Sequence, residues 1–595
     1  MLGAQLATLY QAGRREEVEQ ACRELLAREP ANSEAAHLLG ALLFERGQRA
    51  RALEYFERAA VQQPGNPQLQ NDVGLALHAV GRPEEAMQRF RAAIALEPAF
   101  ADAYCNLGAV LEHAGSDREA LESLDAAIAL QPQLARAHSN RGSVLHKRRE
   151  LDEALRSYDR AIAINPNYAA AHARRGALLL ESGQPAAALA SLDRALSADP
   201  RDLFAYVNRA AALGMLGRFD EALADCQRAV MAHPTNAVAF NARASALVRL
   251  GRHEEALADY ERGMALDPRY AEVHWNAGLC LLRLGRLREG FGLFEWRKRL
   301  PRPLGKRQLA GREWTGQKLL PGSTLLLYAE QGLGDTIQFC RYATLVARAG
   351  VHVLLEVPSS LRGLLTGVEG VARVVSSDEP LPHFDWWCSL LSVPSALGTT
   401  LGSIPGRTPY LRAEPSRVDL WRQRLGPKQR RLRVGLVWAG GFRPDQPELE
   451  AANRRRNIPL EQLAGLRHPQ IEFYTLQKGA AAEQELADAV ARRWPGPDIH
   501  DFTALIRDFA DTAALVENLD LVISVDTSTA HLAGALGKPV WIVNRFDGCW
   551  RWLLARSDTP WYPTARLYRQ DSSRQWDGVL TQVRTDLFEL ATAPD

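Results

Sequence analysis

The sequence predicts an α + α/β fold, with an all-α superhelix in the first half of the chain and two α/β lobes in the second. Two observations support this prediction. A pattern of 34 residues recurs from Ser33 onward, which is typical of stacked helix pairs. Beyond about residue 320, short apolar runs rich in β-branched residues alternate with helical spacing, as parallel sheets require.

The chain of 595 residues is too long for a single hydrophobic core. The two patterns predict where its domains lie: a repeat superhelix of about nine helix pairs in residues 1–300, a junction in 301–320, a first lobe in 321–415 and a second lobe in 430–595. The first lobe is short for a Rossmann-type α/β lobe.

The composition excludes several classes of protein. A formal net charge of +2 gives no global reason to bind nucleic acid or an anionic membrane. The seven cysteines form no CxxC pair and no zinc-type spacing, which indicates reduced thiols rather than disulfides or a metal site. Because neither a secretory signal nor a long apolar run occurs, we expect a cytoplasmic protein without a membrane span.

Small residues and prolines mark each repeat. The eighth position of each full block is small, which lets two helices approach closely. These residues are Gly40, Gly74, Gly108, Gly142, Gly176, Ala210, Ala244 and Gly278. A proline ends each of the first seven full blocks and stops the second helix. The pattern resembles the tetratricopeptide repeat, and the resemblance implies a superhelix whose concave face binds a polypeptide.

Asparagines recur at the sixth position of four blocks. They are Asn106, Asn140, Asn208 and Asn276. An amide both donates and accepts, so a ladder of amides can hold the backbone of an acceptor peptide. The ladder resembles that of protein O-linked N-acetylglucosamine transferase, although other residues interrupt it here. Two alternatives remain: polar positions that merely face solvent, or an arginine-rich face that binds an acidic partner.

In the second half, the stretch from Leu519 to Val543 predicts a strand, an abrupt turn, a helix and a second strand. Thr527 or Ser528 can cap this helix. A helix N-terminus of this kind is suited to a phosphate or diphosphate group. An ordinary strand–helix–strand crossover is the alternative.

Five motifs follow one another in the second half. They are QGLGDTIQF (331–339), VGLVWAG (434–440), RRNIPLEQL (455–463), YTLQKG (474–479) and SVDTSTAHLAGALGKPV (524–540). In this order they resemble the heptosyltransferase family (glycosyltransferase family 9) of inverting GT-B enzymes, in the branch fused to tetratricopeptide repeats. The resemblance implies an acceptor lobe and a nucleotide-sugar donor lobe that face one another, with no metal and no cofactor.

The resemblance implies that Asp335 is the catalytic base. This aspartate follows Gly332 and Gly334, which let the backbone approach a substrate. The alternative is that Asp335 caps the helix that begins at Thr336. Glu330 is the reserve base.

The donor site is predicted in the second lobe. Its residues are Gly440, Arg456, Gln477, Lys478, Asp526, Thr527, Ser528, Thr529 and His531. Lys478 is expected to add a cation to the diphosphate, or to be a solvated lysine at a strand end. Asp526 binds ribose or caps the helix, and His531 contacts the donor or is structural.

These predictions together indicate a bacterial, metal-independent, inverting glycosyltransferase that moves a hexose or heptose from a nucleotide-sugar to a protein acceptor. Serine or threonine hydroxyls are the expected nucleophiles, and flagellin is a candidate acceptor by analogy. One alternative is a non-catalytic scaffold with a degenerate nucleotide-binding module. Another is a lipopolysaccharide heptosyltransferase with an accessory repeat array.

Overall fold

The structure is a computed structural model that describes residues 10, 12–304, 307–429, 431–441 and 447–593. The chain divides into two compact units, Met1–Ala212 and Leu213–Asp595. Part of the first, shortened repeat lies outside the described residues. From Arg15 onward, helices follow one another without any intervening strand as far as Phe294 in the described part of the chain.

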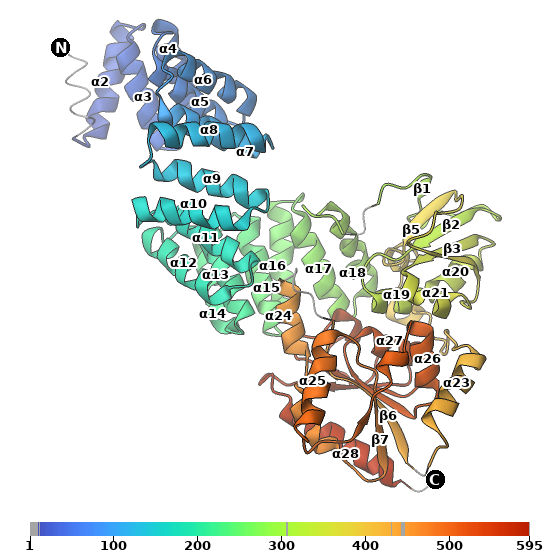
Figure 1. Cartoon of the computed structure of the whole chain (residues 1–595). Coiled ribbons are helices and arrows are strands. Elements are labelled where there is room, and N and C mark those ends of the chain that lie inside the picture. Colours follow the sequence, from blue (N-terminus) through green and yellow to red (C-terminus); the bar gives the residue numbers. More distant parts are fainter. Residues whose placement is uncertain (1–9, 11, 305–306, 430, 442–446, 594–595) are drawn as a thin grey trace. The chain divides into compact units, whose positions relative to one another are not determined.

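Helix pairs build the first unit, drawn in blue to cyan in Figure 1. Their bounds are α2 Arg15–Arg28, α3 Ser33–Glu45, α4 Arg49–Gln62, α5 Pro67–Ala79, α6 Pro83–Leu96, α7 Ala101–His113, α8 Asp117–Leu130, α9 Ala135–Lys147, α10 Leu151–Ile164, α11 Ala169–Glu181 and α12 Pro185–Ala198. Helix α13, Leu203–Met215, lies across the boundary between the units.

The small residue at the eighth position allows each pair to close. A Cβ atom on Gly74 would lie 2.7 Å from the ring of Phe90, and one on Gly142 would lie 2.7 Å from the ring of Tyr158. Both aromatic rings are buried. The glycines therefore leave space for large side chains of the partner helix, which confirms the predicted helix pairs.

The second unit begins with further helices and contains both sheets. The helices are α14 Phe219–Ala232, α15 Ala237–Arg249, α16 His253–Leu266, α17 Ala271–Arg283 and the short α18 Leu287–Phe294, followed by the 3-10 helix η1 Glu295–Arg299. Gly290 and Gly292 stand where earlier repeats carry better helix formers, and α18 has only 8 residues.

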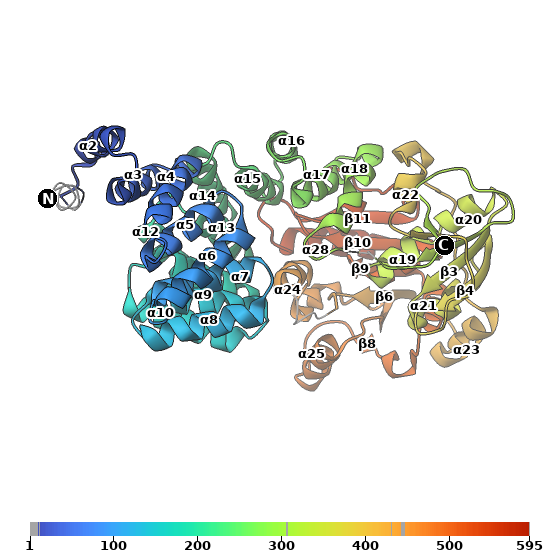
Figure 2. The same cartoon turned by 90° about the horizontal axis from the view of Figure 1, so that it is seen from above.

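All strand pairs in both sheets are parallel. The first sheet has the order β1-β5-β2-β3-β4 and the second β11-β10-β9-β6-β7-β8, and Figure 2 shows β9, β10 and β11 side by side. The fold is therefore α + α/β, as predicted. The strands are β1 Arg312–Glu313, β2 Thr324–Tyr328, β3 His352–Val357, β4 Val371–Ser376, β5 Trp386–Ser389, β6 Leu432–Val437, β7 Ile471–Thr475, β8 Ile499–His500, β9 Leu521–Val525, β10 Val540–Asn544 and β11 Ala565–Arg569.

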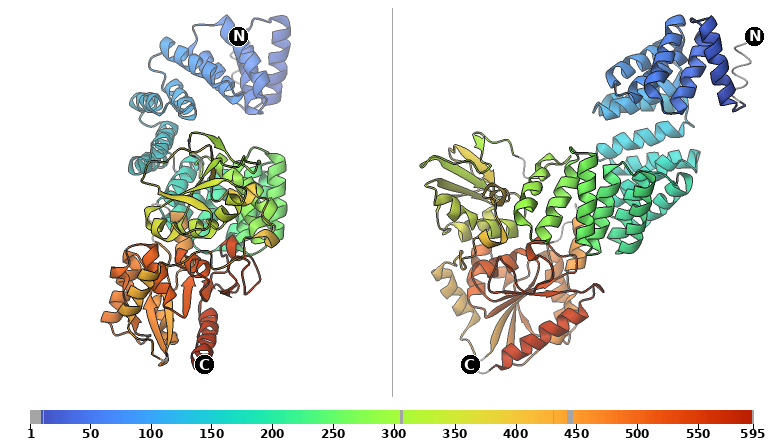
Figure 3. Two further views of the ribbon diagram at one scale, coloured as in Figure 1. Left: turned by 90° about the vertical axis from the view of Figure 1, so that its right-hand side faces the viewer. Right: turned by 180° about the vertical axis from the view of Figure 1, so that it is seen from behind.

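Helices cover the sheets and connect their strands. They are α19 Leu333–Phe339, α20 Tyr342–Ala347, α21 Ser359–Leu365, α22 Val393–Ala396, α23 Pro415–Leu425, α24 Pro447–Arg456, α25 Ala480–Ala491, α26 Phe509–Glu517, α27 Ser528–Ala535 and α28 Asp577–Thr592, with short 3-10 helices η2 Leu401–Ser403, η3 Leu460–Leu466, η4 Thr503–Leu505 and η5 Trp550–Trp552. The long red helix in Figure 3 is α28, whose apolar face packs on the second sheet.

One hydrophobic core joins the last repeat to both lobes. Phe291 and Phe294 of α18 share this core with Leu325 of β2 and with Trp550 and Trp561 of the second lobe. The rings of Phe291 and Trp550 lie edge to face, with centroids 5.6 Å apart. The last repeats and the two lobes are therefore packed as one unit.

Candidate functional site

The N-termini of α19 and α27 meet where strands of the two sheets end. Helix α19 follows β2 and helix α27 follows β9. A Cβ atom on Gly334 would lie 2.8 Å from Cδ2 of His531 and 3.3 Å from Cα of Ser528. The glycine loop of the first lobe therefore touches the predicted phosphate-binding turn of the second, as close approach of two backbones requires.

Asp335 lies at this meeting point, and both of its carboxylate oxygens accept hydrogen bonds. Oδ2 accepts from the backbone N–H of Gly332 at 2.9 Å. Oδ1 accepts from Nη2 of Arg551, a residue of η5 in the second lobe. Because α19 begins at Leu333, Asp335 caps the helix from its third residue, and the ion pair with Arg551 connects the two lobes.

Arg551 was not predicted as a site residue. It is buried, and its Nε also donates to Oε1 of Gln338 at 2.9 Å. Burial is the largest single influence on the pKa of Arg551 and lowers it, but Asp335, Cys549 and Asp526 together outweigh burial, and the pKa is raised. The guanidinium of Arg551 therefore remains charged.

Glu330, the reserve base, lies in a different environment. Its side chain and that of Arg297 are both 0% exposed. Arg297 donates from Nε to Oε1 at 2.7 Å and from Nη2 to Oε2 at 2.6 Å, and Ser389 donates its hydroxyl to Oε2. This enclosed, bidentate ion pair joins η1 to the first lobe, so the position of Glu330 favours a structural role over that of a base.

Three of the predicted donor residues lie together at the ends of β6 and β9. Nη1 of Arg456 donates to the backbone carbonyl of Asp526 at 2.7 Å. A Cβ atom on Gly440 would lie 1.7 Å from Nη2 of Arg456. The guanidinium therefore lies against the Gly440 backbone, and glycine is the residue that leaves room for it there.

We expect Gly440→Ala to displace this guanidinium and, at the donor site predicted from the sequence, to weaken binding of a nucleoside diphosphate about tenfold, since one charge-assisted contact is lost. Gly441→Ala is the matched control because a Cβ atom at Gly441 meets no described residue within 4 Å. Isothermal titration calorimetry of both variants measures the difference. Equal affinities would show that Arg456 does not contribute to the bound state.

Gln477 and Lys478 differ although they are adjacent in sequence. Oε1 of Gln477 accepts from the backbone N–H groups of Trp438 at 3.2 Å and Ala439 at 2.9 Å, and the side chain is buried. Gln477 thus fixes the loop after β6. Lys478 is exposed just beyond β7, where its ammonium can reach a ligand.

The turn before α27 carries the remaining polar residues. Oγ1 of Thr527, the N-cap, lies 3.0 Å from Oγ of Ser524. Asp526, Thr527 and Ser528 are half-buried, whereas Thr529 is buried. The first N–H groups of a helix have no partner within that helix, so this turn has the donors that an anion requires.

His531 is enclosed by aromatic side chains. Its Nδ1 lies 2.9 Å from the hydroxyl of Tyr562, and its ring stacks on Trp552 with centroids 5.0 Å apart. Burial lowers the pKa of His531 to about 3; the charges of Arg551 and Arg341 act in the same direction, and Asp526 opposes them. The imidazole is therefore neutral near pH 7, and its packing favours the structural alternative.

This histidine predicts a specific loss of stability in acid. The unfolded chain takes up the proton near the ordinary pKa of 6.5 and the folded chain only near a pKa of about 3. The contribution of His531 to the free energy of unfolding is therefore fully present above pH 6.5 and decreases as the pH falls toward 3. Urea unfolding at several pH values should show less of this decrease in His531→Gln than in wild type, whereas His383→Gln, at a side chain 88% exposed, should leave it unchanged.

The predicted asparagine ladder takes part in contacts between neighbouring repeats. Nδ2 of Asn106 donates to Oδ1 of Asn71 at 2.8 Å, and Nδ2 of Asn276 donates to Oδ1 of Asn241 at 3.0 Å. Nδ2 of Asn140 lies 3.7 Å from Sγ of Cys105. Asn106 and Asn140 are each only 7% exposed, so the structure favours packing between helices over an open amide ladder for these two.

Asn208 and the arginines of the predicted concave face make other contacts than the asparagine pairs between repeats. Nδ2 of Asn208 donates to the carbonyl of Phe204, one turn earlier in its own helix, at 2.8 Å. The arginines that were an alternative acidic-partner site instead pair within the array. These pairs are Arg141 with Asp125, Arg175 with Asp159 and Arg209 with Asp193. They connect adjacent repeats.

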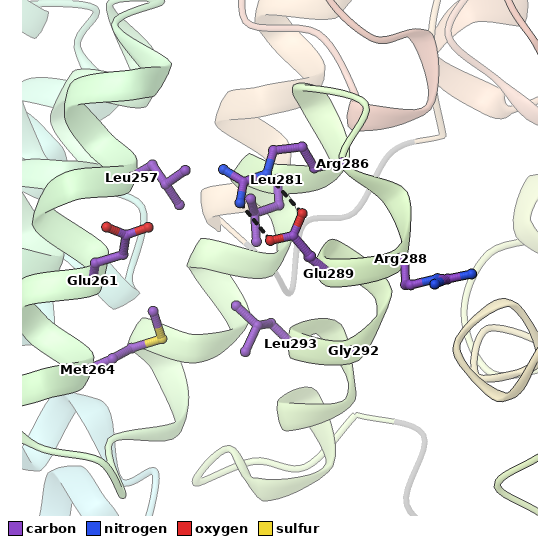
Figure 4. Close-up of a pocket in the computed structure, with 9 residues that line it drawn as sticks. All are labelled: Leu257, Glu261, Met264, Leu281, Arg286, Arg288, Glu289, Gly292 and Leu293. Carbon is purple, nitrogen blue, oxygen red and sulfur yellow. Dashed lines mark hydrogen bonds and ion pairs between the residues drawn. The ribbon is translucent and has the colours of Figure 1, made fainter. Parts of the chain in front are cut away.

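A separate pocket of about 390 Å³ lies among α16, α17 and α18 (Figure 4). Leu257, Met264, Leu281 and Leu293 give it an apolar lining, and the ion pair of Arg286 with Glu289 lies at its side. Its lining residues belong to these repeat helices, except Arg286, which caps the N-terminus of α18. The pocket is therefore distinct from the strand-end site.

No group of three or more His, Cys, Asp or Glu side chains in the described part of the chain is arranged to hold a metal ion. No helix among those residues is both long enough and apolar enough to cross a membrane.

Comparison with known sequences identifies the class of the first half. Tetratricopeptide-repeat families match residues 7–67, 74–115, 101–134, 135–168, 157–190, 174–237 and 244–285. The first half of the chain is therefore a tetratricopeptide-repeat array, a type of domain that serves in protein interaction.

Protein FlbA of Caulobacter vibrioides (strain ATCC 19089 / CIP 103742 / CB 15) is similar to this chain, with 29% identity over 314 residues. The match covers 48% of this chain and 50% of FlbA, so it spans about half the length of that relative.

Solved structures match shorter shares of the chain. MamA is 24% identical over 27% of this chain and 93% of its own, with a TM-score of 0.25. YrrB, described as a TPR protein with an unusual peptide-binding site, is 24% identical over 31% of this chain and 95% of its own, with a TM-score of 0.26. PilF of Pseudomonas aeruginosa is 20% identical over 35% of this chain and 94% of its own, with a TM-score of 0.31.

Proposed function

We propose that this chain is an inverting, metal-independent glycosyltransferase, which moves a sugar from a nucleotide-sugar to a protein acceptor recruited by the repeats. A serine or threonine hydroxyl is the proposed nucleophile, and flagellin remains a candidate acceptor. The observation that carries the proposal is the meeting of α19 and α27, because it brings a carboxylate of one lobe to an anion-binding turn of the other.

The donor side of this arrangement suits a departing nucleoside diphosphate. The first N–H groups of α27 and the hydroxyls beside them can donate hydrogen bonds to the phosphate oxygens. Arg456 lies at the carbonyl of Asp526, and Lys478 is exposed at the neighbouring strand end. Together these groups supply positive charge to the leaving group without a metal ion.

On the acceptor side, Asp335 would act as the general base. As the acceptor oxygen attacks the anomeric carbon and the bond to the diphosphate breaks, the hydroxyl proton passes to a carboxylate oxygen of Asp335. The resulting configuration at the anomeric carbon is inverted. Because Oδ1 is bonded to Arg551 in the structure, the acceptor must share or replace that contact.

The same ion pair favours a second function, a non-catalytic scaffold. Both oxygens of Asp335 are engaged, one by Gly332 and one by Arg551. In a scaffold, this polar contact would only lock the two lobes together, and the nucleotide-binding turn would be a remnant. The two functions make opposite predictions for Asp335→Asn.

We expect purified full-length protein to be stabilised against thermal unfolding by at least one nucleoside diphosphate in a screen of nucleotides and nucleotide-sugars. With the matching donor, Asp335→Asn should lower sugar transfer about a hundredfold or more while nucleotide binding is kept. Lys478→Met should weaken nucleotide binding instead. Absence of any nucleotide binding would contradict the proposed glycosyltransferase function. Glycan analysis of cells with and without this protein would distinguish protein acceptors from lipopolysaccharide acceptors.

A further inference from the structure

Five arginines surround the carboxylate of Asp547, beside the end of β10. They are Arg249, Arg283, Arg455, Arg545 and Arg574. Arg249 and Arg283 are the last residues of α15 and α17 in the repeats, whereas the others and Asp547 belong to the second lobe. We call these six residues the arginine cluster. All of them lie within the second compact unit.

Asp547 is too deeply buried and too heavily shared to neutralise the cluster. Its side chain is 2% exposed. It lies 2.8 Å from Nη1 of Arg249, 3.2 Å from Nε of Arg545 and 3.5 Å from Nη2 of Arg455. Asp547 thus pairs directly with three guanidinium groups. The guanidinium groups of Arg283 and Arg574 lie within range of its field, and Asp220 also acts on Arg574.

The surplus positive charge is unfavourable in the protein as it stands. Burial lowers the pKa of Arg455 to about 10, and Arg249, Arg545 and Arg574 lower it further, against the opposing effect of Asp547. Burial and then Arg249 lower the pKa of Arg283 as well. The buried Nε atoms of Arg283 and Arg455 have no hydrogen-bond partner among the residues that the structure describes.

Aromatic rings form part of the surroundings of the cluster. The guanidinium of Arg574 lies 4.1 Å from the ring centroid of Phe219 and 4.7 Å from that of Phe546. These cation–π contacts position the guanidinium of Arg574 but do not neutralise its positive charge. The side chain of Arg249 is 44% exposed, so the cluster is open to solvent on that side.

We propose that the arginine cluster is a second anion site, which binds a small, multiply charged oxyanion such as a phosphate or diphosphate group. Guanidinium groups suit this ligand because each is planar and can donate two parallel hydrogen bonds to phosphate oxygens. A bound dianion supplies the negative charge and the acceptors that Asp547 cannot. The site is separate from the turn at α27, although Arg455 is adjacent in sequence to Arg456.

The test uses the full-length chain, inorganic pyrophosphate and Arg283→Met. This change removes one surplus charge but keeps an aliphatic side chain, and Arg283 makes no direct pair with Asp547. We expect affinity for pyrophosphate to fall about tenfold or more, while the melting temperature of the ligand-free protein stays the same or rises. Arg283→Lys should retain most of the affinity. Arg286→Met, three residues later in an exposed pair with Glu289, is the matched control.

A second pair of measurements separates this site from the proposed donor site. Pyrophosphate binding that survives in Lys478→Met and is lost in Arg283→Met supports the cluster, whether or not the chain transfers sugar. If a nucleoside diphosphate displaces pyrophosphate, the oxyanion belongs to that nucleotide; if both bind together, it is a separate ligand. No saturable binding, or binding that Lys478→Met abolishes and Arg283→Met leaves intact, would overturn the proposal.

Discussion

Replacing Glu330 by alanine is expected to destabilise the second compact unit by about 3–5 kcal/mol, because it leaves the buried charge of Arg297 without its main partner. Both side chains are wholly buried, and two short hydrogen bonds join them. Arg297 retains Glu295, whose Oε1 lies 2.7 Å from its Nη1. That remaining pair is partly exposed and does not replace the lost bidentate contact.

Tryptophan fluorescence is a suitable measurement for this change. All 13 tryptophans lie after residue 212, so their signal reports unfolding of the second compact unit alone. The double change Arg297→Met with Glu330→Leu should recover much of the loss, because no unpaired charge is then buried. A Glu330 variant that keeps its stability but loses sugar transfer would contradict the structural role and identify Glu330 as the base.

Replacing Gly334 by alanine is expected to push α19 away from α27. The new Cβ atom would meet Cδ2 of His531 at 2.8 Å and Cα of Ser528 at 3.3 Å. The first atom belongs to a ring that stacks on Trp552, and the second is backbone, so neither can move freely. We expect a cost of about 1–3 kcal/mol from this overpacking.

The expected functional result of Gly334→Ala is weaker nucleotide binding, since the turn before α27 is displaced as well. Gly578→Ala in α28 provides the control: a Cβ atom there meets nothing within 4 Å in the described part of the chain, and the change should be neutral or stabilise by up to about 1 kcal/mol. Urea unfolding followed by tryptophan fluorescence compares the two. Equal stability of both variants would show that α19 and α27 are not in firm contact.

The sequence predicted the repeat array well because its period is local. Glycine at the eighth position and a large residue 16 positions later, as in Gly74 and Phe90, determine how one helix packs on its partner. The contacts of the asparagines could not be predicted from the repeat period. Whether Asn106 faces solvent or Asn71 depends on the rotation between successive repeats, which the period alone does not give.

The candidate site was predicted in part, for a similar reason. Strand ends and glycines identify Asp335 and the turn before α27 from local sequence. Arg551, however, follows Asp335 by 216 residues and lies in a short 3-10 helix without a recognisable motif. The aromatic run around Trp550 and Trp552 is the one signal that could have pointed to this segment as part of a core.

The division of the chain at Ala212 has a consequence for the way such proteins can be shortened or recombined. The last repeats and both sheets belong to the same compact unit after that point. A fragment that begins at residue 301 would instead lose Phe291, Phe294 and Arg297 and expose the apolar surface that they cover. A stable minimal fragment should therefore keep the last repeats together with both lobes.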